Sequence, residues 1–169
     1  MRVFISLILL TVIFSCGEEK SGNNKVSFTK HQVDSMVEDL EKKYNRMEED
    51  RIRDYISRHE PMRKTSSGFW YVINSKNEQG REIKDGDLVK YSREISLCNS
   101  QQLYNDENIL KIGQGHEISG MHAALKLLRQ GEKATFIFPS FLAHGLLGDM
   151  EKVPPKSELI YKVEILDVK

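Results

Sequence analysis

Few side chains of this 169-residue chain are arranged for metal, nucleophilic or phosphate chemistry. His116 and His122 are six residues apart with no thiol nearby, which is more typical of loop histidines than of metal ligands. Cys98 has no histidine in a motif with it and is expected to be an ordinary thiol at the end of a strand. Gly113-Gln114-Gly115 is not followed by the lysine and the serine or threonine of a phosphate-binding loop. The sequence therefore predicts no metal and no cofactor.

The overall charge argues against one class of partner. The chain carries 25 basic and 25 acidic side chains, so its formal net charge is zero. A nucleic-acid-binding surface normally requires a basic excess. We therefore expect no nucleic-acid partner.

The N-terminus has the pattern of an export signal. A single arginine precedes an apolar run from Val3 to Phe14, which is too short to span a bilayer. The run ends in Ile13-Phe14-Ser15-Cys16, which resembles a bacterial lipobox. We expect residues 1–15 to be a lipoprotein signal peptide and Cys16 to be acylated, anchoring the protein to the envelope, on the periplasmic side of the outer membrane or at the cell surface. The alternative is a plain secretory signal in which Cys16 occurs by chance.

Two segments connect this signal to the rest of the chain. Residues 16–28 are rich in Gly, Ser, Asn and charges, as in a flexible tether. Residues 29–60 contain no Gly or Pro and are expected to form an amphipathic helical arm. Its apolar residues follow a 4, 3, 4, 3 spacing: Val33, Val37, Leu40, Tyr44 and Met47. This stripe fits packing of the arm on its own domain or a homodimer through the helix, and a rotated stripe continues at Ile52, Tyr55 and Ile56.

Residues 66–169 have the pattern of one α+β domain. Alternating apolar residues predict strands at 68–73, 88–97, 134–138 and 159–165, and a short apolar run lies at 109–112. A helix is predicted over 120–130, with Gly131 as its C-terminal stop. Several strands and one short helix indicate a bent antiparallel sheet wrapped around that helix, preceded by the long N-terminal helix.

The order and spacing of residues 86–169 are specific. The chain reads ISGMHAALKLLRQGEKATFIFPSFLAHG from Ile118 and resumes as VPPKSELIYKVEILDVK from Val153. This succession of helix, strand, glycine-bearing loop, Pro-Pro turn and closing strand resembles FKBP-type peptidyl-prolyl cis-trans isomerases. The layout of signal, helix and domain looks like the gliding-motility-associated FKBP-type lipoproteins of Bacteroidota. The resemblance implies an FKBP-like fold and action on proline-containing polypeptides of the envelope or the motility apparatus.

Prolyl isomerisation needs neither a nucleophile nor a metal. It rotates an amide across a barrier of about 18–20 kcal/mol, and the twisted transition state is less polar than the planar amide. An apolar pocket and a backbone N–H that holds a neighbouring carbonyl are sufficient in principle. The resemblance places catalytic roles on Ile118, Tyr104, His144 and Tyr161, and substrate-binding roles on Arg93, Asn105, Glu117, Met121 and Val153.

Several of these positions depart from the family pattern. Arg93 stands where the resemblance places a strand tyrosine, Met121 replaces the tryptophan of the pocket floor, and His144 replaces a loop tyrosine. A cation on the inward face is costly unless it is paired, so we expect an ion pair between Arg93 and Glu117 at the rim. The substitutions leave three functions open: an isomerase, a catalytically weak or inactive binding module or chaperone, and a structural component of an envelope machine.

Overall fold

The computed structural model describes residues 27–169 and begins with a long helix, α1, over Lys30–Ser57. Thr29 caps this helix: its side-chain oxygen accepts a hydrogen bond from the Gln32 backbone N–H, and the Gln32 side chain accepts one from the Thr29 N–H at 2.9 Å. This reciprocal arrangement satisfies two amides that the first helical turn leaves without partners. The predicted lipidation site, Cys16, and the predicted signal peptide lie outside the described residues.

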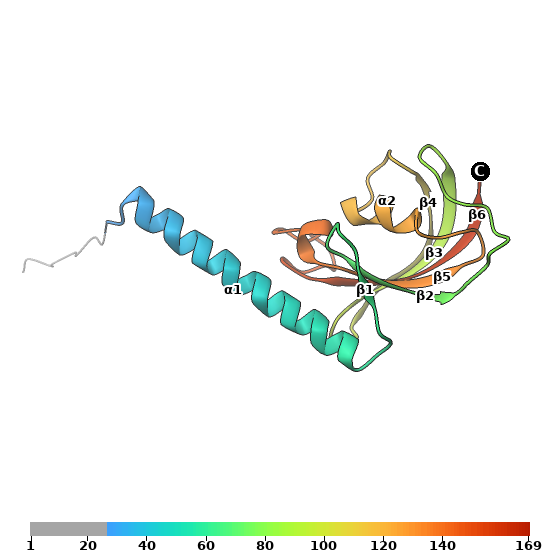
Figure 1. Ribbon diagram of the computed structural model, residues 1–169. Coiled ribbons are helices and arrows are strands. Elements are labelled where there is room, and N and C mark those ends of the chain that lie inside the picture. The colour runs from blue at the N-terminus through green and yellow to red at the C-terminus, as the bar shows by residue number, and fades with distance from the viewer. Residues whose placement is uncertain (1–26) are drawn as a thin grey trace, which may run out of the picture.

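The two halves of α1 have different surroundings (Figure 1). The stripe predicted from the heptad spacing remains 45–51% exposed: Val33, Val37, Leu40, Tyr44 and Met47. The arm does pack on its own domain, but mainly through the rotated stripe and not through this one. Packing begins near Tyr44, whose ring lies under Lys156 Nζ at 4.1 Å from its centroid, and becomes complete at the rotated stripe, where Ile52 and Tyr55 are buried.

Six strands form one sheet in the order β1-β2-β5-β6-β3-β4, and every neighbouring pair is antiparallel. Their bounds are β1 Arg63–Lys64, β2 Trp70–Ser75, β3 Leu88–Leu97, β4 Gln102–Lys111, β5 Lys133–Phe138 and β6 Leu159–Val168. A short 3-10 helix, η1, covers Ser140–Leu142. The sheet curves around the second helix, α2, over Ser119–Leu125 (Figure 1). The predicted α+β fold is confirmed.

Alternation along the strands creates an apolar layer on each face of the sheet. On the concave face, α2 buries Met121, Ala124 and Leu125 against the larger core, together with Phe136 and Phe138 of β5. On the opposite face, a smaller cluster joins the C-terminal half of α1 to the sheet: Ile52, Tyr55, Trp70, Cys98, Ile137 and Ile160. Burial of apolar area in this smaller cluster gives the arm a fixed attachment.

Polar contacts also fasten α1 to the domain. Arg51 donates from Nε and from one terminal nitrogen to the two carboxylate oxygens of Glu158, at 2.7 and 2.8 Å. The buried carboxylate of Glu48 accepts a hydrogen bond from the Ser140 backbone N–H at 2.7 Å. Because both carboxylates are buried, these bonds offset their loss of water.

Two elements differ from their predicted lengths. Strand β4 spans ten residues and extends well before the apolar run noted at 109–112, because it is the edge strand next to β3 and can form its ladder with polar side chains facing water. Helix α2 ends at Leu125, earlier than predicted, because the next amides bond three residues back, Leu127 to Ala124 and Leu128 to Leu125. The apolar spacing continues through these turns and so imitates a longer helix.

Within residues 27–169, none of the helices combines the length and apolar character needed to cross a membrane.

Candidate functional site

A cleft of about 620 Å³ opens at the concave side of β3, β4 and β6. We call it the concave cleft. Loops on either side complete it, one before α2 and one after η1. Five predicted site residues line it: Arg93, Tyr104, Glu117, His144 and Tyr161. The other lining residues are Ile95, Asn108, Ile109, Leu110, Lys111, Gln114, Gly115, His116 and Asp149.

Glu117 is the centre of the polar contacts in the concave cleft. Its Oε2 accepts hydrogen bonds from the Tyr91 hydroxyl at 2.9 Å, Arg93 at 2.7 Å and the Asn108 amide at 2.9 Å. Its Oε1 accepts the backbone N–H of Ile118 at 3.2 Å. The predicted ion pair between Arg93 and Glu117 is therefore present. Its side chains are only 18% and 7% exposed, so it is a largely desolvated pair.

Arg93 also binds a second carboxylate, which the sequence analysis did not predict. Its Nε donates to Asp106 at 2.7 Å across the β3–β4 ladder, where the two residues are direct partners. Burial lowers the pKa of Arg93, but the hydrogen bond that it donates to Asp106 and the charge of Glu117 outweigh this effect and raise that pKa. The guanidinium therefore stays charged and is held in one orientation by two acids.

Tyr91 is a residue of the site that the resemblance to the family did not indicate. It lies two residues before Arg93 on the same face of β3 and is fully buried. Burial and the neighbouring charge of Glu117 raise its pKa, so the phenol remains a hydrogen-bond donor. The strand thus retains an inward tyrosine, although Arg93 was taken to replace it. The alternation of Val89, Tyr91 and Arg93 was the signal that could have identified it.

Tyr104 joins the loop after η1 to strand β4. Its hydroxyl donates a short hydrogen bond to Asp149 Oδ2, and Lys152 Nζ lies 4.7 Å from the centroid of its ring. The other oxygen of Asp149 accepts the backbone N–H groups of Glu151, Lys152 and Val153 at 2.8–2.9 Å. These contacts fix the loop that carries His144, so the wall of the concave cleft is held from both sides.

Tyr161 forms the deepest aromatic wall of the concave cleft. It is 1% exposed and packs edge-to-face on Phe138, with ring centroids 5.3 Å apart. Burial raises the pKa of its hydroxyl, and the charge of Glu117 adds to the rise. Among residues 27–169, no hydrogen bond is formed by this hydroxyl, although every fully enclosed side-chain polar atom there has a partner. The hydroxyl therefore faces the open space of the concave cleft.

Four predicted site residues are placed differently. Met121 and Val153 are buried in the larger core and do not line the concave cleft, because each points into the layer between α2 and the sheet. The side chain of Ile118 is buried there too, and only its backbone N–H reaches the cleft through Glu117. Asn105 is exposed on the opposite face of β4 from Tyr104, because successive strand residues point to opposite faces. Met121, Val153 and Asn105 therefore do not line the concave cleft, and their substrate-binding roles stay predictions.

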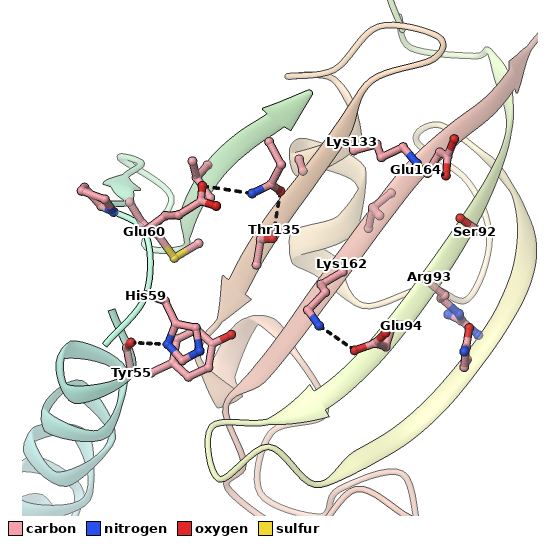
Figure 2. Close-up of a pocket in the computed structure, with 17 residues that line it drawn as sticks. Tyr55, His59, Glu60, Ser92, Arg93, Glu94, Lys133, Thr135, Lys162 and Glu164 are labelled. Atoms are coloured by element: carbon pink, nitrogen blue, oxygen red, sulfur yellow. Dashed lines mark hydrogen bonds and ion pairs between the residues drawn. The ribbon is translucent and has the colours of Figure 1, made fainter. Parts of the chain in front are cut away.

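A larger hollow of about 820 Å³ lies on the convex side, between the end of α1 and the sheet (Figure 2). Asn105 belongs to this outer groove. Four of its charged side chains form two ion pairs, Lys162 with Glu94 at 2.8 Å and Lys133 with Glu164 at 2.9 Å (Figure 2). The concave cleft is the better candidate site, because it combines desolvated charges with aromatic walls and an open hydroxyl.

The chemistry available in the concave cleft is positioning and desolvation. Among the described residues, no three His, Cys, Asp or Glu side chains are gathered as metal ligands. His122 Nδ1 accepts the Gly113 backbone N–H at 3.2 Å, which explains this histidine as a loop contact. Two tyrosines and one arginine line the concave cleft and can hold a peptide and exclude water from it.

Comparison with known proteins agrees with this geometry. The family model for FKBP-type peptidyl-prolyl cis-trans isomerases matches residues 79–166, which include strands β3 to β5, helix α2 and most of β6. A probable FKBP-type peptidyl-prolyl cis-trans isomerase of Haemophilus influenzae is 32% identical over 127 residues, covering 72% of this chain and 51% of the relative.

Two further similarities add detail. The human protein named inactive peptidyl-prolyl cis-trans isomerase FKBP6 is 31% identical over 84 residues, covering 47% of this chain and 26% of that protein. The chain thus spans about half or less of these two relatives. The crystal structure of FkpA from Escherichia coli superposes with a TM-score of 0.61 at 21% identity, over 85% of this chain and 74% of that one. The fold is therefore shared beyond the matched segment, and the chain belongs to the family of FKBP-type peptidyl-prolyl cis-trans isomerases.

Proposed function

We propose that this protein is a peptidyl-prolyl cis-trans isomerase that acts on proline-containing polypeptides. The observation that carries the proposal is the concave cleft itself, which lies within the segment matched by the family and is lined by aromatic side chains. A nucleophile or proton relay is not required for this reaction, because only a rotation about the amide bond takes place.

The walls of the concave cleft provide a physical route to faster rotation. Tyr104, His144 and Tyr161 would displace water from the prolyl ring, and a less polar surrounding favours the twisted amide over the planar one. A backbone donor at Ile118 would hold a neighbouring carbonyl, so that part of the rotation barrier is overcome by binding. The guanidinium of Arg93, held by two carboxylates, would orient the rest of the peptide.

The test is prolyl cis/trans exchange on a short Xaa-Pro peptide, measured by NMR with a soluble form from Lys25 to Lys169. We expect acceleration that is lost in Ile118→Pro, which removes the backbone N–H. The φ of Ile118 is −55°, within the range of proline, so the backbone tolerates this change. A folded protein that gives no acceleration would contradict the proposal.

A second candidate function is a binding module or chaperone with little or no catalysis. It is favoured by Glu117, whose carboxylate takes up the backbone donor that an isomerase would use. Peptide binding without faster exchange would support it. A structural component of an envelope machine, with α1 as its docking element, would instead bind no prolyl peptide in the concave cleft.

We further propose that the protein is a lipoprotein of the bacterial envelope that assists envelope or motility proteins. The support is the apolar N-terminal run that ends at Cys16. Mass spectrometry of the protein from membranes should show cleavage before Cys16 and an acylated N-terminus. Cys16→Ser should abolish both, and an unmodified mature N-terminus would refute the anchor.

The exposed stripe of α1 supports a homodimer through that helix. Five apolar residues at heptad spacing are about half exposed, which is the arrangement that two packed helices would cover. Sedimentation equilibrium should give twice the mass of one chain, and Leu40→Glu should return the protein to one chain. A monomer at micromolar concentration would rule out this assembly.

A further inference from the structure

The N–H of Ile118, the backbone donor expected to hold a substrate carbonyl, is occupied by the chain itself. This amide takes part in no backbone hydrogen bond of the described residues, and its partner is the side chain of the preceding residue, Glu117, at 3.2 Å. It immediately precedes α2, in a segment that lines the concave cleft. A donor in that position can bind an incoming carbonyl only when the carboxylate leaves it.

The Glu117 carboxylate is held next to the Ile118 N–H by the surrounding structure. The Glu117 side chain is 7% exposed, and three donors from two strands hold its other oxygen: Tyr91, Arg93 and Asn108. Arg93 is in turn fixed by Asp106. Moving Glu117 off Ile118 therefore requires this whole cluster to adjust.

A carboxylate is also a stronger acceptor than an amide carbonyl. Hydrogen bonds with an ionised partner are about twice as strong as neutral ones. A peptide carbonyl that competes for the same N–H must displace the stronger acceptor, and its apparent affinity falls with the fraction of molecules in which the donor is open.

We propose that Glu117 is an autoinhibitory side chain, which closes the backbone donor of the concave cleft and limits both peptide binding and isomerisation there. The proposal rests on the proposed function in that the ligand is a prolyl peptide. It assigns to Glu117 a role opposite to substrate binding: the wild-type cleft is mostly closed, and replacing the carboxylate opens it.

The experiment compares the wild-type protein with Glu117→Val and Glu117→Gln. The control is Glu158→Gln, because Glu158 is an equally buried, arginine-bound carboxylate that does not line the concave cleft. Three quantities are measured for each: the ¹H–¹⁵N signal of Ile118, the affinity for an Xaa-Pro peptide from peptide-induced shifts, and the exchange rate of that peptide. Thermal unfolding reports whether each variant folds.

We expect the Ile118 amide proton to move upfield in Glu117→Val, since the charged acceptor is gone. The peptide should bind this variant about tenfold more tightly, which is the scale of one hydrogen bond to a charged group, and should then shift the Ile118 signal. Glu117→Gln should fall between Val and wild type, because a neutral amide oxygen is a weaker acceptor. Glu158→Gln should match the wild type in all three quantities.

The proposal is overturned if a folded Glu117→Val binds the peptide no better than wild type, or if its Ile118 signal does not move. If Glu117→Val fails to fold, the same two readouts on Glu117→Gln decide. If no variant accelerates exchange, the isomerase function fails, yet tighter peptide binding at Ile118 in Glu117→Val would still support the autoinhibitory contact. An active wild type with an unchanged Glu117→Val would keep the function and remove the proposal.

Discussion

Glu117 and Glu158 lie on opposite sides of the sheet and their side chains are equally exposed, at 7%. Each binds an arginine, but the surroundings differ. Glu158 receives two hydrogen bonds from Arg51 of α1, whereas Glu117 receives one from Arg93 and three from other groups. The first pair therefore works as a clamp between two elements, while the second is one part of a network that survives the loss of a member.

The sharpest test of this difference is removal of each arginine. Arg51→Ala leaves Glu158 with neither of its two arginine hydrogen bonds, which should lower the free energy of unfolding by about 3 kcal/mol. Arg93→Ala leaves Glu117 with three donors, so its cost should be about 1 kcal/mol. Urea unfolding of both variants measures the two losses. Equal losses would show that the number of remaining donors does not matter.

A substitution at Met121 changes the packing on the concave face without changing the charges of the concave cleft. Met121→Trp puts a larger ring at a fully buried position and should cost about 2 kcal/mol by overpacking. Because Met121 does not line the concave cleft, isomerase activity should not rise. Thermal unfolding measures the change in stability, and prolyl exchange measures the change in activity. A gain in activity at unchanged stability would mean that the side chain at position 121 does reach the peptide.

Asp149, in the wall of the concave cleft, should make the stability of the protein depend on pH at low pH. Burial would raise the pKa of Asp149, but the hydrogen bond from Tyr104 and three backbone amides lower it to about 2. Its unfolded value is about 3.9, so its contribution to stability is present above pH 4 and is lost as the pH falls toward 2.

Asp149→Asn should therefore flatten the stability profile between pH 5 and pH 2, relative to wild type. The comparison requires unfolding curves at several pH values for both proteins. Parallel profiles would mean that Asp149 has the same pKa in the folded and unfolded chains.

The smallest effect is expected from the outer groove. Glu94 and Lys162 form an ion pair whose side chains are 35% and 56% exposed. Exposed pairs contribute about 0.2–1 kcal/mol, so Glu94→Gln should change the free energy of unfolding by less than about 0.5 kcal/mol and leave peptide exchange unaltered. A decrease in the free energy of unfolding as large as that of Arg51→Ala would show that this ion pair of the outer groove is important for stability.

The fold was predictable where the sequence carries periodic apolar residues. Strand β3 and the region of α1 follow such patterns, whereas β4 was mostly missed because an edge strand needs no continuous apolar face. The fate of the α1 stripe was not predictable, since a heptad pattern fits packing on a domain and packing on a second helix equally well.

Part of the candidate site was predictable because a buried charge requires a partner of opposite charge. A buried arginine needs an acid, and this led from Arg93 to Glu117. Asn105 lies outside the concave cleft because successive residues of a strand point to opposite faces of the sheet, and its neighbour Tyr104 takes the inward position. The link between Tyr104 and Asp149 joins residues 45 positions apart, and no local pattern in the sequence announces such a contact.

The attachment of α1 has a mechanical consequence. A helix of 28 residues is about 42 Å long, and here one end is secured to the domain by Arg51, Glu48 and an apolar seam while the other extends outward (Figure 1). Such an element behaves as a rigid lever. Whatever holds its outer end would also set how far away the concave cleft lies and in which direction it opens.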